Sequence, residues 1–123
     1  MPVWADVPEL LGEAANAWQT GNIKQACQAY HEAQALSPTH PQVLYGVSLC
    51  YQQSNVGKAV ATLTQLVGLY PNYGPAWLLL GELYEQQGRQ ADAIEAYRRY
   101  VSLGEPLPKS PSLRLRLRQW GLI

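Results

Sequence analysis

The chain has 123 residues, of which 47% are hydrophobic and 15% are charged, and its formal net charge is zero. This composition predicts a folded chain, and the length predicts one domain. The balanced charge argues against nucleic-acid binding, which needs a strongly basic surface. No apolar run approaches the ~20 residues of a membrane span, and the N-terminus lacks the features of a signal peptide. We therefore expect a cytoplasmic protein, either complete or a fragment of a longer one.

The charge is unevenly placed along the chain. Residues 1–88 carry a formal charge of −4, whereas residues 89–123 carry +4. A solvated basic end is the simpler interpretation. The basic end could also dock an acidic partner or the acidic end of a second copy, and the sequence leaves these alternatives open.

Turn and capping residues divide the chain into short helices. Asp6 is typical of an N-cap, with a proline in the first turn and Glu9 completing a capping box. We expect the third helix to be capped by Thr39. Asn55, which tolerates a left-handed backbone, is expected in the turn before the fourth helix. The expected helices span about 7–19, 23–36, 40–53, 56–70, 74–87 and 90–103.

The C-terminal segment is ambiguous by pattern alone. Leucine and arginine alternate from Leu113 onward, as they would in a strand. However, Ser110 and the proline after it are typical of a helix start, and Leu113, Leu117 and Trp120 fall at helical spacing. We therefore predict a helix at about 111–120 that covers the apolar side of the preceding element.

A self-similarity with a period of roughly 34 residues runs through the chain. The third copy shows it best, in Trp77, Leu80, Gly81, Tyr84, Gly88, Ala93 and Tyr97. These residues and their spacing resemble the tetratricopeptide repeat family. The resemblance implies an all-α fold, a right-handed α-solenoid of helix-turn-helix repeats at approximately 7–40, 41–73 and 74–107, closed by the C-terminal capping helix.

The physical reason for the motif is close helix packing. Ala26, Ala59 and Ala93 stand at the same position of each copy, where a small side chain lets the two helices of a repeat cross closely. Gly21 and Gly88 stand at the turns, where glycine permits the backbone that ends a helix.

In proteins similar to this one, the first helix of each repeat lines a concave groove that holds a partner. The resemblance carries this role onto Leu11, Ala15, Trp18, Gln42, Tyr45, Leu49, Gln52, Leu78, Glu82 and Glu85. The expected groove is apolar at its centre and acidic toward the third repeat. It lacks the lysine, asparagine and arginine that grip chaperone C-terminal carboxylates in related domains, so we exclude that specificity.

An apolar groove suits an amphipathic helix or an extended apolar segment of another protein. We therefore predict a protein–protein interaction module, acting as an adaptor, a scaffold or a chaperone-like binder. The alternative is a homo-oligomeric structural protein that associates through the groove or through its oppositely charged ends. The chain's own termini, Val3–Trp4 or residues 120–123, could also fill the groove.

The sequence indicates no further chemistry. Cys27 and Cys50 lie in helical patterns without a CxxC pair, which favours two small buried apolar residues over a disulfide. His31 and His40 have no partners at metal-ligand spacing, so we predict no metal site.

We also predict no cofactor and no enzymatic activity. Glu82 and Glu85 lie one turn apart, as an acid pair could. Exposed carboxylates on such a helix are more often solvated or in contact with a partner, and no phosphate loop or nucleophile motif accompanies them.

Overall fold

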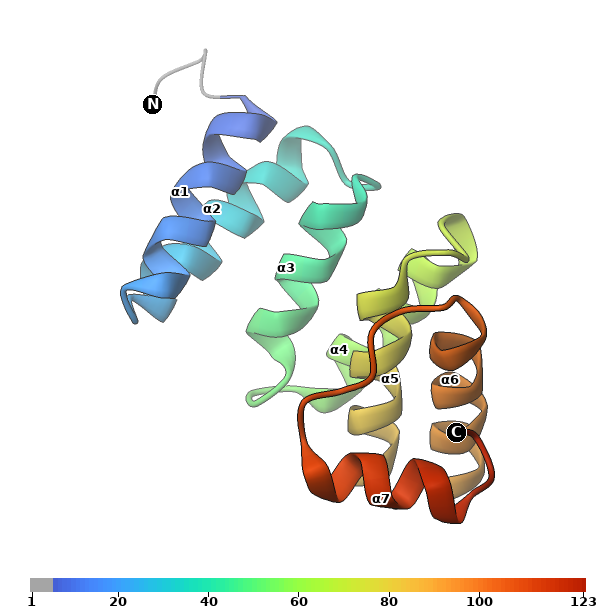
Figure 1. The fold of residues 1–123 in the computed structure, drawn as a ribbon. Coiled ribbons are helices and arrows are strands. Elements are labelled where there is room, and N and C mark those ends of the chain that lie inside the picture. Colours follow the sequence, from blue (N-terminus) through green and yellow to red (C-terminus); the bar gives the residue numbers. More distant parts are fainter. Residues whose placement is uncertain (1–5) are drawn as a thin grey trace. The chain divides into compact units, whose positions relative to one another are not determined.

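The computed structural model describes residues 6–123, and every regular element in that range is a helix (Figure 1). The helices are α1 (Val7–Gln19), α2 (Ile23–Leu36), α3 (Pro41–Tyr51), α4 (Val56–Leu69), α5 (Gly74–Gln86), α6 (Gln90–Ser102) and α7 (Pro111–Gln119). Their bounds agree with the sequence prediction within the margin by which helix ends are defined. The chain divides into two compact units, the first ending at Leu69 and the second beginning at Tyr70.

Two of the predicted helix starts are confirmed by side-chain caps. The amide N–H of Glu9 donates to Asp6 Oδ1 at 3.0 Å at the start of α1. At the start of α7, the amide N–H of Leu113 donates to Ser110 Oγ at 3.3 Å. Each bond satisfies a backbone donor that the first turn of a helix leaves unpaired.

Two other expected turn residues act differently from the prediction. His40, rather than Thr39, caps α3, because the amide N–H of Gln42 donates to His40 Nδ1 at 3.2 Å. Asn55 is not left-handed, since no non-glycine residue in the described range has a positive φ. Its side-chain Oδ1 instead accepts from the amide N–H of Lys58 at 3.1 Å, so Asn55 caps α4.

The first unit is built from α1 to α4, with each helix packed against the next in the chain. A cluster of small and aliphatic residues forms its core: Leu10, Ala14, Ala29, Ala33, Val43 and Val47. Ala26 and Ala59, predicted at close helix crossings, have no exposed surface. Small buried side chains therefore allow the short helices of this unit to pack closely.

Two glycines allow a tyrosine ring to lie directly against a helix backbone. A Cβ atom at Gly46 in α3 would overlap the ring of Tyr30 in α2. In the second unit, a Cβ atom at Gly81 in α5 would overlap the ring of Tyr97 in α6. The repeat motif predicts the glycine at Gly81. Gly46 lies outside the motif positions, so its close contact with a tyrosine was not predicted.

The second unit consists of the α5–α6 hairpin and α7. Leu113 and Leu117 of α7 are buried against Ala93 and Tyr97 of α6. These contacts confirm a C-terminal helix that packs through the residues at helical spacing, not through every second residue.

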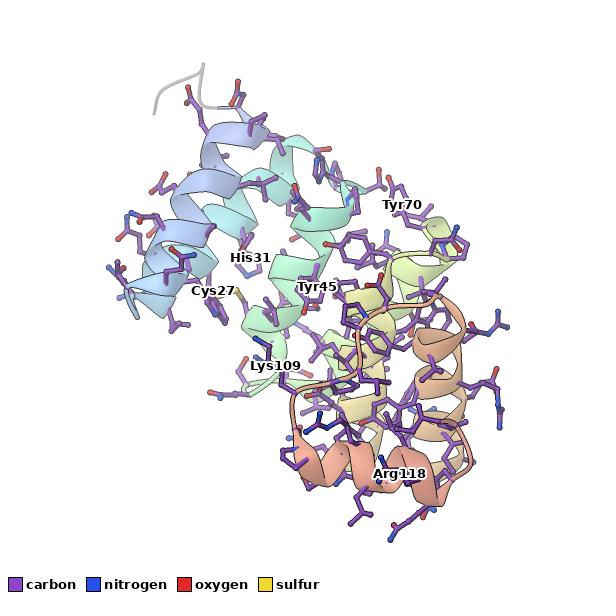
Figure 2. The ribbon with its side chains drawn as sticks, in the orientation of Figure 1. Cys27, His31, Tyr45, Tyr70, Lys109 and Arg118 are labelled. Carbon is purple, nitrogen blue, oxygen red and sulfur yellow. A yellow bond between two sulfur atoms is a disulfide. The ribbon has the colours of Figure 1, made fainter. Side chains whose placement is uncertain are left out.

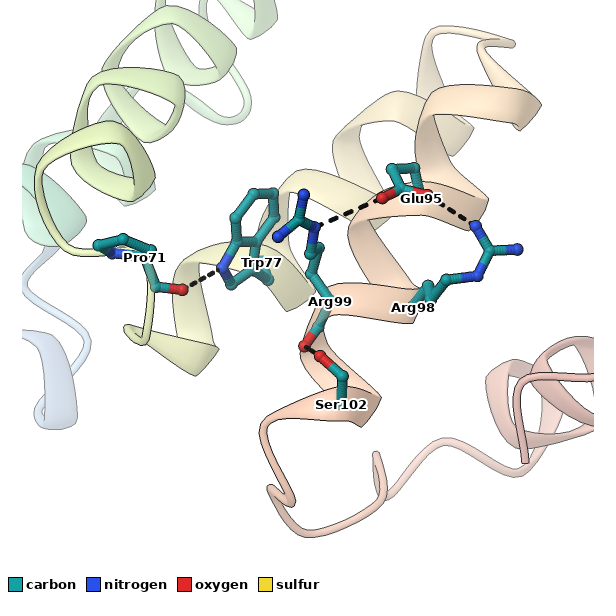
Figure 3. A network of polar contacts seen from close by, with 6 residues as sticks. All are labelled: Pro71, Trp77, Glu95, Arg98, Arg99 and Ser102. Atoms are coloured by element: carbon teal, nitrogen blue, oxygen red, sulfur yellow. Dashed lines mark hydrogen bonds and ion pairs between the residues drawn. The ribbon is translucent and has the colours of Figure 1, made fainter.

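A polar network lies on the α5–α6 side of this unit (Figure 3). The indole Nε1 of Trp77 donates to the carbonyl oxygen of Pro71 at 2.7 Å. The guanidinium of Arg99 lies 5.7 Å from the centre of the Trp77 ring, and Glu95 pairs with both Arg98 and Arg99. Through exposed side chains, the network links the segment before α5 to α6.

The loop between α6 and α7 is tied down by Tyr100. This residue stands where the repeat motif usually has a small side chain. Its buried ring places the hydroxyl where it donates to the carbonyl oxygen of Pro106 at 2.6 Å. Burial, followed by the nearby charge of Glu105, raises the pKa of Tyr100.

Candidate functional site

The first unit carries a shallow hollow on its surface, lined by both apolar and amide side chains. Its walls come from the end of α1, the start of α2 and the end of α3, through Trp18, Ile23, Leu49, Cys50, Gln52 and Gln53. We call this the Trp18 hollow. Three of its residues, Trp18, Leu49 and Gln52, were predicted to line a groove, and the structure brings them together.

The α1–α2 turn explains why Ile23 joins these residues. Gly21 adopts a φ of 81°, which lets the chain reverse within a few residues after α1 ends. The amide N–H of Asn22 then donates to the carbonyl oxygen of Ala17 at 2.8 Å. The reversal places Ile23, 45% exposed, at the hollow with Trp18. Ile23 was missed because it begins a second helix, outside the positions that the resemblance points to.

The other predicted groove residues of the first unit have varied exposure. Leu11 is half-buried and packs against the core cluster. Tyr45 of α3 is half-buried, and Ala15 and Gln42 are exposed. These four residues do not line the Trp18 hollow.

The two cysteines form a disulfide, so the prediction of two buried free thiols is wrong. Cys27 of α2 and Cys50 of α3 are bonded, with their Cα atoms 5.7 Å apart (Figure 2). Both are half-buried, not buried. The packing of α2 against α3 brings together residues that are 23 positions apart in the sequence. Because Cys50 also lines the Trp18 hollow, the disulfide fixes one wall of it.

Aromatic contacts surround the disulfide-linked helices. His31 meets Tyr51 edge to face, with ring centres 5.6 Å apart, and the Lys58 ammonium lies 5.5 Å from the centre of the Tyr51 ring. His31 thus contacts an aromatic ring. Within residues 6–123, no three histidine, cysteine, aspartate or glutamate side chains gather in a way that could hold a metal ion.

In the second unit, the predicted groove residue Glu85 is engaged by the chain's own α7. Arg116 Nε donates to Glu85 Oε2 at 2.8 Å, and Arg116 Nη2 donates to Oε1 at 3.0 Å. The Tyr97 hydroxyl also donates to Glu85 Oε1. Such a bidentate pair is both strong and geometrically specific.

Burial and the charges around Glu85 raise the pKa values of three neighbouring side chains. The hydrogen bond to Glu85 raises the pKa of Arg116 further above its ordinary value. Burial, followed by the hydrogen bond to Glu85, raises the pKa of Tyr97. Loss of hydration and then repulsion from Glu85 raise the pKa of Glu82, while Arg116 opposes the shift.

Leu78, the remaining predicted groove residue, packs against the cluster of Ala93, Tyr97, Leu113 and Leu117. Two of the three predicted residues of this unit therefore contact α6 or α7, and Glu82 is exposed. Trp120 stacks on Tyr97, and Leu122 packs on the same cluster. The other terminal segment considered, Val3–Trp4, lies outside the described residues.

A family model described as "Tetratricopeptide repeat" matches residues 11–73 and 51–111. The chain belongs to the tetratricopeptide repeat family. A comparison with curated protein sequences finds no match.

Solved structures show the same fold at low sequence identity. The crystal structure of MamA has a TM-score of 0.72 at 23% identity, over 79% of this chain and 57% of that one. This chain therefore spans little more than half of the MamA chain. The Yersinia enterocolitica type III secretion translocator chaperone SycD has a TM-score of 0.77 at 17% identity, over 93% and 79% of the two chains.

A third structure contains a bound peptide. It is the first tetratricopeptide repeat domain of Spaghetti (RPAP3) with the HSP90 peptide SRMEEVD, with a TM-score of 0.77 and 17% identity over 93% of this chain and 89% of that one. At these identities the likeness shows the fold alone. None of the helices in residues 6–123 has the length and apolar character needed to cross a bilayer.

Proposed function

We propose that the chain is a protein–protein interaction module that holds an apolar segment of a partner at the Trp18 hollow. The observation that carries the proposal is the hollow itself: Trp18, Ile23 and Leu49 form its apolar part, on a fold that other proteins share in structures solved with a bound peptide. Apolar side chains gathered at an opening usually mark an interaction site.

The lining suits an amphipathic helix or an extended apolar peptide. The apolar residues would bury a side chain of the partner. The amides of Gln52 and Gln53 at the rim both donate and accept hydrogen bonds, so they suit backbone or uncharged polar groups. Among the described residues 6–123, none that lines the hollow is charged, which favours a neutral contact surface. On the first unit, the proposed surface extends to Leu11, Ala15, Gln42 and Tyr45. On the second unit, the predicted contacts are Leu78, Glu82 and Glu85.

Relatives of the same fold support the class of ligand. The RPAP3 domain was crystallised with an HSP90 peptide, and SycD has been crystallised with a peptide of the translocator YopD. The absence of lysine, asparagine and arginine at the groove positions of this chain still argues against a carboxylate-gripping mode. Adaptor, scaffold and chaperone-like roles all follow from such binding, and we assign the chain no catalytic role.

Site-specific photo-crosslinking tests this proposal. Benzoylphenylalanine placed at the exposed Gln53 should crosslink to a partner in cell extract, whereas the same residue at the exposed Gln65 of α4 should not. Leu49→Glu should abolish the crosslink at position 53 without loss of helicity. Equal crosslinking at both positions, or a crosslink that Leu49→Glu leaves unchanged, would contradict the proposal.

The same experiment separates the alternative of self-assembly. A crosslink at Gln53 to a second copy of the chain, with a sedimentation coefficient that rises with concentration, would favour a homo-oligomer joined through this surface. Association through oppositely charged ends would instead weaken at high ionic strength, because salt screens exposed charges.

The expected cytoplasmic location is part of the proposal, and the disulfide bears on it. Disulfides persist in oxidising compartments and are rare in the cytosol. Rapid alkylation of freshly lysed cells reports the redox state of Cys27 and Cys50. Free thiols would support the cytosol, and a protected disulfide would point to an oxidising compartment.

A further inference from the structure

The helix α7 has two different faces. On one face, Leu113 and Leu117 are buried and Arg116 pairs with Glu85. On the other, together with the preceding loop, five residues line a shallow hollow: Leu107, Pro111, Arg114, Leu115 and Arg118. We call this second surface the α7 outer face.

Two leucines are exposed on the α7 outer face. Leu107 is 49% exposed and Leu115 is 52% exposed. The outer surface of a helix that only covers the end of a repeat stack is expected to be polar. Apolar side chains gathered at a hollow indicate a contact with another molecule.

Three cations on or just before α7 form no ion pair within residues 6–123. The ion pairs within residues 6–123 use Arg89, Arg98, Arg99 and Arg116. Lys109, Arg114 and Arg118 take part in none of them, and residues 107–123 contain no aspartate or glutamate. The α7 outer face is therefore positive as well as apolar (Figure 2 labels Lys109 and Arg118).

Helix stability does not account for all of these charges. Arg118 lies in the last turn of α7, where a cation interacts favourably with the helix dipole. Lys109, by contrast, precedes the N-cap Ser110, where the dipole favours acidic residues. Arg114 is the fourth of the nine residues of α7 and lies outside the last turn, so the dipole favours neither of these two cations. A ligand that brings negative charge would account for their placement.

We propose that the α7 outer face binds an acidic amphipathic helix of a partner protein. Arg114 and Arg118 are four residues apart, or about 6 Å along the helix axis. A partner helix with carboxylates at the same spacing can pair with both guanidinium groups, and a leucine beside them can pack on Leu107 and Leu115. On the inner face of the same helix, Arg116 donates to both oxygens of a carboxylate in bidentate geometry.

The observations favour this partner over a lipid surface or a nucleic acid. An interfacial membrane helix needs a broad apolar face, but Leu113 and Leu117 are turned into the core. Single-stranded nucleic acid is usually held by stacking on aromatic rings, and the α7 outer face has no aromatic residue in the part of the chain that the structure describes.

The test uses a fluorescent peptide of about 20 residues with the repeat Glu-Leu-Ala-Ala, long enough for partial helicity. Its binding to the full chain is followed by fluorescence anisotropy. Arg114→Gln/Arg118→Gln should weaken binding about tenfold, since exposed ion pairs contribute up to about 1 kcal/mol each. The control Arg98→Gln/Arg99→Gln removes the same charge from α6 and should change binding less than about twofold. Leu115→Gln should weaken binding, and Leu49→Glu, at the Trp18 hollow, should not.

Several outcomes would overturn the inference. They are no binding of the acidic peptide, equal loss in the two double arginine variants, or equal binding of a peptide with lysine in place of glutamate. Binding to phosphatidylserine vesicles that Arg114→Gln/Arg118→Gln abolishes, without binding of the peptide, would assign the surface to a membrane instead. Loss of binding in Leu49→Glu would place the peptide in the Trp18 hollow.

Discussion

The rings of Tyr97 and Trp120 stack with their centres 6.0 Å apart and their planes 21° from parallel. Tyr97 belongs to α6, and Trp120 directly follows α7. The same Tyr97 ring lies against Gly81, and its hydroxyl donates to Glu85. One buried tyrosine thus contacts all three helices of the second unit.

The stacked pair should contribute measurably to stability. We expect Trp120→Ala to lower the free energy of unfolding by about 1–3 kcal/mol, because it removes a half-buried aromatic contact. Urea denaturation of the full chain measures the change. Leu115→Ala is the matched control on the exposed face of α7 and should change stability by less than about 0.5 kcal/mol. Equal losses in the two variants would contradict the assigned packing.

Glu82 should make stability depend on pH in a defined direction. Its pKa is raised in the folded state, so the folded chain holds this proton more tightly than the unfolded chain. The resulting stability is fully present below the ordinary glutamate pKa and is lost as pH rises through the raised value.

It follows that Glu82→Gln should stabilise the chain at pH 7 and have little effect at pH 4. The gain should stay below about 1 kcal/mol, because solvent screens an exposed group. Urea denaturation at both pH values tests this. Glu32→Gln, at an exposed glutamate of α2, is the control, and an equal pH-dependent difference there would argue against a local cause.

Adding a methyl group to Gly46 should destabilise the first unit. The new Cβ atom would meet the Tyr30 ring, so α2 and α3 would have to separate, at a cost of about 1–3 kcal/mol. Gly12 is the control, since a Cβ atom there has no neighbour within 4 Å and α1 would gain helix propensity. Gly12→Ala should stabilise by about 0.5–1 kcal/mol. Thermal unfolding compares the two variants, and a Gly46→Ala protein as stable as the parent would refute the close approach.

The disulfide should stabilise the oxidised chain against unfolding. A cross-link over a loop of this length is expected to contribute about 3 kcal/mol. Cys27→Ser/Cys50→Ser should therefore unfold at lower urea concentration than the oxidised parent. Dithiothreitol should lower the stability of the parent but not that of the double variant. A parent that is insensitive to reductant would argue against the bond.

The helices could be predicted from the sequence because their signals are local. Asp6 and Ser110 cap through a side chain within three residues of the bonded amide, and both were identified. In α7, Leu113 and Leu117 are buried while Leu115 is exposed, so helical spacing prevailed over the alternating pattern.

The disulfide and the contacts of Glu85 could not be predicted in the same way. Pairing of Cys27 with Cys50 depends on how α2 packs against α3, which their spacing along the chain does not reveal. A covering C-terminal helix was predicted, but its arginine partner for Glu85 lies 31 residues away. Both are tertiary contacts that arise only once the helices pack.

The candidate site was predicted in part. Trp18, Leu49 and Gln52 lie together, although Trp18 comes from α1, Leu49 from α3 and Gln52 directly follows α3. Ile23 and Gln53 also line the hollow, and neither was predicted to do so. The groove positions implied by the family lie on one face of the first helix in each repeat. The hollow is also lined by residues that flank the turns.

The Cys27–Cys50 bond also alters how the chain would respond to a mechanical load. In a stack of repeats, tension applied at the two ends passes along the backbone and peels helices away one after another. Here the load would cross from α2 to α3 through the sulfur atoms, so the 22 residues between the two cysteines would carry no tension. Fully stretched, the oxidised chain should be shorter than the reduced chain by about 70 Å. Single-molecule pulling with and without reductant would read out this difference as a step in contour length.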